Sequence, residues 1–172
     1  MKRAAIFAGL LLLLGTPSFA QSSSIGFIFG ASERADDGLD FNFGNSVKEV
    51  FYAAELDEGT LLRIKAGRLD TEFDAVEDPS EPAEGHIEYI QALVEYRFYE
   101  VFGSTGVYAG PGLYRARAGS NEQTDWGFEA GLTGVFPFSR RVGILVQLGY
   151  HWVHVEERPT FFTAGAGIKI NF

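Results

Sequence analysis

The sequence predicts an all-β protein: an eight-stranded antiparallel up-and-down transmembrane β-barrel, preceded by a cleaved signal peptide. Three observations lead to this fold class. A short apolar run stands near the N-terminus, apolar and polar residues alternate along later segments, and the links between these segments are short at one end and longer at the other. Alternation with period two gives a strand one apolar and one polar face.

The N-terminus has the layout of a secretory signal. Lys2 and Arg3 precede an apolar run over 4–15, and Ser18-Phe19-Ala20 supplies small residues for cleavage after Ala20. A run of about twelve residues is too short for a bilayer, which needs roughly twenty. We therefore expect a signal peptide over 1–20 and one barrel domain over 21–172.

The amino-acid composition excludes several kinds of site and partner. The chain has no cysteine, which excludes disulfides, thiolate metal sites and a cysteine nucleophile. Its formal charge is −9, and it becomes more negative when Lys2 and Arg3 are removed. This charge argues against nucleic acid and anionic lipid headgroups as general partners.

Alternation along the chain defines the strands. At the C-terminal end, Ile168, Ile170 and Phe172 share one face, and Lys169 and Asn171 share the other. The same division predicts strands at 24–33, 46–57, 60–72, 86–99, 105–117, 125–136, 142–155 and 160–172. Pro111, between two glycines, cannot donate to a ladder, so we expect a bulge or bend in the fifth strand.

The links between strands predict an orientation. Links at 57–59, 100–104 and 137–141 are short, whereas loops at 33–45, 72–85, 118–124 and 156–159 are more polar and mostly longer. Short turns on one side and longer loops on the other are typical of bacterial transmembrane barrels. Aromatic girdles should then lie at both interfaces, with Trp126, Trp152 and Phe162 near the loops and Phe98 and Phe136 near the turns.

This pattern resembles the small eight-stranded outer-membrane β-barrels of the OmpA-like and OmpX/Ail-like kind. The resemblance covers most of the predicted mature chain and is clearest in the last strand, which alternates and closes with an aromatic residue. It implies that Ile168, Ile170 and Phe172 act as the signal that the barrel assembly machinery recognises.

The lumen should be filled by side chains, because eight tilted strands enclose room only for these or for one small ligand. A porin-sized channel is therefore excluded. The predicted phase turns four carboxylates and four cations inward: Glu49, Glu55, Arg63, Lys65, Glu95, Arg97, Glu129 and Lys169. Buried charges must be paired, so we predict a salt-bridge network acting as a structural plug, with a proton or ion pathway as the alternative.

Catalytic and metal chemistry have little support. His151 and His154 are three residues apart in one strand and face opposite sides, and no serine, histidine and carboxylate share a face. We expect no enzyme, no cofactor and no metal site. Carboxylates gather in the loops, where they form a mobile surface or bind divalent cations or a surface ligand.

The sequence thus predicts a monomeric protein of the cell outer membrane with a structural, envelope-integrity or surface-interaction role. Its expected partners are outer-membrane lipid and the barrel assembly machinery, with no nucleic acid. One alternative is a narrow channel for small hydrophobic molecules, lined by Phe51, Leu93, Tyr108 and Leu145. Others are a soluble lipocalin-like ligand-binding barrel and a lipid-modifying barrel enzyme.

Overall fold

The computed structural model describes residues 22–35, 45–73, 83–118, 121–154 and 160–172. The predicted signal peptide, 1–20, lies outside these ranges. Among the described residues no helix is long and apolar enough to cross a membrane. The described chain forms β1 (Ser23–Arg34), β2 (Asn45–Asp57), β3 (Thr60–Phe73), β4 (Ala83–Glu100), β5 (Gly103–Ala118), β6 (Asn121–Pro137), β7 (Val142–Val153) and β8 (Thr160–Asn171).

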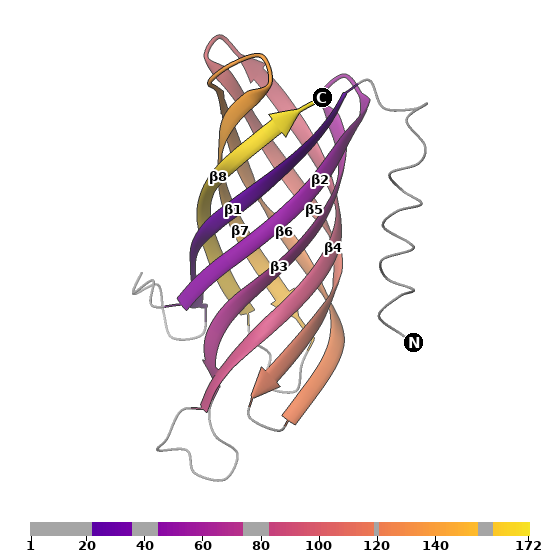
Figure 1. Cartoon of the computed structure of the whole chain (residues 1–172). Coiled ribbons are helices and arrows are strands. Elements are labelled where there is room, and N and C mark those ends of the chain that lie inside the picture. Colours follow the sequence, from indigo (N-terminus) through magenta and orange to yellow (C-terminus); the bar gives the residue numbers. More distant parts are fainter. Residues whose placement is uncertain (1–21, 36–44, 74–82, 119–120, 155–159) are drawn as a thin grey trace.

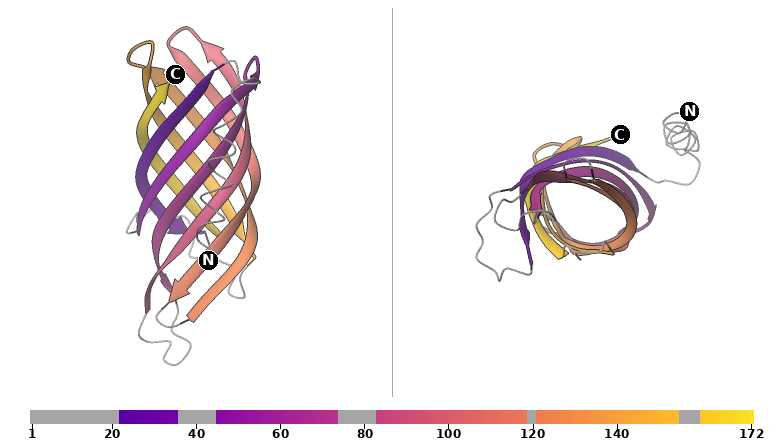
Figure 2. Two further views of the ribbon diagram at one scale, coloured as in Figure 1. Left: turned by 45° about the vertical axis from the view of Figure 1, so that its right-hand side comes forward. Right: turned by 90° about the horizontal axis from the view of Figure 1, so that it is seen from below.

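These strands form one closed antiparallel barrel in sequence order, which confirms the predicted fold class. β8 pairs with β1 and removes the open edge, as the side and end-on views show (Figures 1 and 2). Ser23 and Phe172 exchange backbone hydrogen bonds of 3.2 and 2.9 Å, so the two ends of the described barrel meet. Figure 1 places the C-terminus beside the short turns.

The close pairing of β1 and β8 requires small residues. A Cβ atom added at Gly167 would lie 1.7 Å from the backbone oxygen of Phe27, and one at Gly30 would lie 2.1 Å from that of Ala164. No side chain can be accommodated at such distances without backbone movement. Glycine therefore permits the approach of the strands that close the barrel.

Strand ends differ most from prediction around β5 and β6. The expected seven-residue link over 118–124 shrinks to residues 119–120, so Glu122 belongs to β6 and not to a loop. Glu122 pairs with Arg115 at 2.5 Å and with Arg117 at 3.0 Å across the two strands. Cross-strand pairs of opposite charge favour such an extension of the ladder.

Of the bulge or bend predicted at Pro111, the bulge is wrong. The β4–β5 register is the same on both sides of the proline, since Gln91 pairs with Gly112 and Val94 with Ala109. Pro111 instead lies in regular register opposite Phe128 of β6. Gly110 allows the close approach to β4, because an added Cβ would lie 2.0 Å from the oxygen of Ala92.

The barrel is apolar outside and holds its buried polar and charged side chains inside. On the outer wall of β7, Ile144, Leu148 and Trp152 are 49%, 57% and 47% exposed, whereas the intervening Gln147 and His151 are buried. A soluble lipocalin-like barrel would have the opposite arrangement, so that alternative is wrong. An outward apolar face and a polar interior are what a transmembrane barrel requires.

Candidate functional site

The centre of the lumen contains a buried ion-pair cluster, here called the central cluster: Glu49 of β2, Lys65 of β3 and Glu129 of β6. The Lys65 ammonium lies 2.8 Å from Glu49 and 2.7 Å from Glu129. All three side chains are at most 1% exposed. Burial of these charges is tolerated because one cation lies between two carboxylates.

Hydrogen bonds from tyrosines complete the central cluster. The Tyr89 hydroxyl donates to Glu49 at 2.5 Å, and the Tyr108 hydroxyl donates to Glu129 at 2.7 Å. Lys65 also lies 5.6 Å from the ring centroid of Tyr89 and 5.7 Å from that of Tyr108. These contacts supply both hydrogen bonds and a cation–π environment to a charge withdrawn from water.

A second group, the turn-side cluster, consists of Arg63, Glu95 and Arg97. Glu95 pairs with Arg63, accepts from Arg97 Nε at 2.6 Å and accepts from Thr133 at 3.0 Å. Gln147 joins the two clusters, because it accepts from Arg63 at 2.9 Å and donates to Glu49 at 2.9 Å. The two clusters are therefore one connected network through the core of the barrel.

Apolar side chains pack around this network. One buried set lies in the loop-side half and includes Leu69, Ile87 and Phe161. Another includes Ile28, Phe51 and Leu145. Arg63 lies 4.7 Å from the Phe51 ring centroid, so the apolar and charged groups interlock.

Six of the eight predicted lumen charges join the network, and two do not. Glu55 is only half-buried; it accepts from Ser22 at 2.5 Å and from Tyr99 at 3.1 Å at the rim. Its place as the last inward position before the turn, beside a register shift between Glu55 and Asp57, explains this difference. Lys169 is buried but has no ion pair within 4.0 Å among the described residues. Among the described residues, three of the four predicted carboxylates (Glu49, Glu95 and Glu129) are buried together with all four predicted cations, so the charges of the buried set do not balance.

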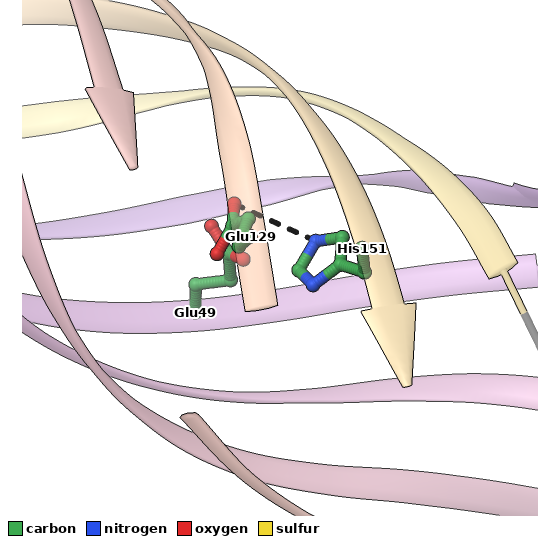
Figure 3. Close-up of side chains that lie close together, drawn as sticks. All are labelled: Glu49, Glu129 and His151. Atoms are coloured by element: carbon green, nitrogen blue, oxygen red, sulfur yellow. Dashed lines mark ion pairs between the residues drawn. The ribbon is translucent and has the colours of Figure 1, made fainter. Parts of the chain in front are cut away.

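His151 lies beside the central cluster. Ligand atoms of Glu49, Glu129 and His151 lie within 4.8 Å of one another, the spacing of a metal site, which the sequence did not predict (Figure 3). Lys65, however, already provides a cation between the same two carboxylates. The arrangement therefore fits an internal ion-pair network.

The contacts of His151 do not form a catalytic triad. Its Nε2 approaches Thr163 at 3.2 Å and Glu129 at 3.5 Å, while Nδ1 faces Tyr114 at 3.0 Å. In a triad the carboxylate orients the ring from the nitrogen opposite the nucleophile. Here the hydroxyl and the carboxylate share one nitrogen, and His151 is 0% exposed.

The predicted assembly and girdle residues lie on the outer wall. Ile168 and Ile170 of β8, and Phe172 directly after it, are 54%, 41% and 69% exposed. Phe98, Phe136, Trp126 and Trp152 are also exposed there. Phe162 is partly covered by Tyr150, with ring centroids 4.5 Å apart.

The acidic loops on which cation or surface-ligand binding was predicted lie mainly outside the described residues, at 36–44, 74–82 and 155–159. Sequence analysis did not assign Tyr89, Tyr108 or Gln147 to the network. All three occupy inward positions of strands in which apolar and polar residues alternate. This alternation was the signal that could have placed them in the lumen. The alternation alone does not show which inward side chains contact one another across the barrel.

Comparison with solved structures identifies the fold. The N-terminal β-barrel domain of Pseudomonas aeruginosa OprF is 18% identical, with a TM-score of 0.59 over 89% of this chain and 99% of that one. This is the fold of the small eight-stranded outer-membrane barrels. Neisserial surface protein A (12% identity, TM-score 0.66) covers 88% of this chain and 96% of its own. OprG from P. aeruginosa (10% identity, TM-score 0.57) covers 89% and 96%.

The likeness to these small outer-membrane barrels confirms the resemblance inferred from the strand pattern. At such identities it concerns the fold. No family model matches the chain, and no curated protein matches its sequence.

Proposed function

We propose that this chain is a structural protein of the outer membrane, a barrel sealed by its own side chains that supports envelope integrity and conducts no solute. This proposal is supported by the connected network of side-chain hydrogen bonds that runs from Arg97 through Glu95, Arg63 and Gln147 to Glu49. A closed network across the narrow lumen of an eight-stranded barrel leaves its charges bound to one another and not to passing ions.

A channel for small hydrophobic molecules is the weaker proposal. Its predicted lining residues, Phe51, Leu93, Tyr108 and Leu145, are at most 3% exposed. Arg63 lies over both Phe51 and Tyr108. An apolar solute would have to displace a buried guanidinium from these rings.

Planar-bilayer conductance tests the sealed-barrel proposal. The refolded protein should give no discrete conductance steps, whereas the double variant Phe51→Ala/Tyr108→Ala should give them, because it removes two lumen-filling rings. A matched variant, Phe128→Ala/Leu113→Ala, removes outer-wall side chains and should stay silent. The unaltered protein should be checked for folding by its heat-dependent mobility on a gel. Conductance steps from the folded, unaltered protein would show that the lumen is open.

We also propose that the closing strand carries the assembly signal. Phe172→Ser should reduce the amount of protein recovered in the outer membrane several-fold, because the terminal aromatic is lost from the strand that the assembly machinery engages. Phe138→Ser, which alters an 82% exposed aromatic in a turn, is the control and should leave recovery unchanged. Equal membrane recovery of both variants would contradict the assembly role, provided both refold equally well in detergent.

A further inference from the structure

Among the described residues, the most exposed large apolar side chains lie on two turns. Val101 and Phe102, between β4 and β5, are 91% and 86% exposed, and Phe138, between β6 and β7, is 82% exposed. The two turns are neighbours, because Ser104 near the start of β5 pairs with Val135 near the end of β6. Figures 1 and 2 show both turns at the end of the barrel that carries the C-terminus. An exposed apolar patch of this kind marks a surface that contacts a membrane or a partner.

The turn between β4 and β5 does not require these residues. Glu100 pairs with Gly103, so Val101 and Phe102 are the two central residues of a tight hairpin. Two-residue hairpin turns favour asparagine, aspartate and glycine, which adopt the backbone conformations of such turns. A β-branched and an aromatic residue do not favour the turn, and at this exposure they contribute little to packing within the barrel. Their apolar character therefore serves a contact outside the barrel.

The lipid-facing wall continues without interruption into the second turn. Outward positions of β6 are apolar from Trp126 through Leu132 to Phe136, which are 60%, 54% and 54% exposed. Phe138 follows two residues later in the same alternation. The apolar column over 126–138 is therefore longer than the roughly 9–11 residues with which a tilted strand crosses a bilayer. Such an excess is accommodated when the protein tilts or the bilayer thickens beside it.

Charge distinguishes these two turns from the turn between β2 and β3. Arg140 and Arg141 follow Phe138 directly and are exposed. The turn between β2 and β3 instead carries Asp57 and Glu58 and no aromatic residue. Cations near a membrane are attracted to anionic lipid, whereas carboxylates are repelled by it. The turn-side rim is thus apolar and basic on one side and acidic on the other.

We propose that Val101, Phe102 and Phe138 insert into the headgroup region of the turn-side leaflet, with the barrel tilted towards β5 and β6 and the acidic turn left in water. Aromatic side chains favour the membrane interface, and arginine keeps its guanidinium among the headgroups while its stem lies along apolar surface. The leaflet is the occupant because the lipid-facing wall of β6 adjoins Phe138. The tilt concerns the position of the folded barrel and not its assembly.

Spin labelling tests this placement, and the absence of cysteine from the chain leaves only the introduced thiol to react. Single nitroxide labels are attached through Val101→Cys, through Glu58→Cys in the acidic turn and through Leu132→Cys on the lipid-facing wall. The barrel domain over 21–172 is refolded into nanodiscs of phosphatidylethanolamine and phosphatidylglycerol, whose two faces are both open to solution. Oxygen, which partitions into lipid, should relax the labels at positions 101 and 132 several-fold more than a water-soluble nickel complex does. The label at position 58 should show the reverse.

Phe102→Asp should make the label at position 101 more accessible to nickel, because the turn loses an apolar anchor, whereas Asp57→Asn should leave that label unchanged. Heat-dependent mobility on a gel establishes that each variant is folded. A label at position 101 as accessible to nickel as the one at position 58 overturns the proposal and leaves the two turns in water, open to a soluble partner. A label at position 58 as accessible to oxygen as the one at position 132 also overturns it, because the whole rim would then lie in the membrane without a tilt.

Discussion

Replacing Lys65 by methionine should lower the free energy of unfolding by about 3–5 kcal/mol, the typical result of leaving buried charges without their partner. Lys65 is 0% exposed and is bonded to both Glu49 and Glu129. Methionine keeps much of the side-chain volume, so the loss comes from two carboxylates that face each other without a counter-charge. Urea-driven unfolding in lipid vesicles measures this change in the free energy of unfolding.

Lys48→Met is the matched control, because Lys48 is exposed on the outer wall of the neighbouring strand. Its effect should stay within about 0.5 kcal/mol. Adding Glu49→Gln and Glu129→Gln to Lys65→Met should restore part of the lost stability, since the neutral set no longer contains unpaired charges. If Lys65→Met behaves like Lys48→Met, the central cluster does not hold the lumen together.

Replacing Leu148 by arginine should cost about 2–4 kcal/mol, the range for a cation on the lipid face at the bilayer midplane. Leu148 is 57% exposed on the outer wall, in register with Leu132 and Ala164. No acidic side chain is its direct partner on either strand. The arginine would therefore lie in the hydrocarbon layer, and the same unfolding measurement reports the cost.

The same substitution near the turns serves as the control. Leu56 is 50% exposed on β2, next to the turn. Leu56→Arg should cost only about 0–1 kcal/mol, because an interfacial cation reaches water and headgroups. Equal costs at the two leucines would mean that the membrane does not cover the outer wall around Leu148.

The local alternation of apolar and polar residues was sufficient to predict the strands and the outward and inward face of each one. Each residue of a strand points to one side or the other, so the alternation around Leu148 and Gln147 could be interpreted without knowledge of any other strand. Boundaries near Arg115 and Glu122 were missed because ion pairs between two strands extend the ladder. Such pairs depend on register, which no single segment reveals.

The sequence by itself therefore determined the fold class, the number of strands and which side chains face lipid or lumen, because these follow from period-two alternation. Only the tertiary structure decided the partners inside: Lys65 with Glu49 and Glu129, Gln147 between the clusters, Glu55 at the rim, and Lys169 with no ion pair to any described residue. Closure of the barrel and the register of its strands set the height of each inward side chain. Height and reach across the lumen then determine which charges meet.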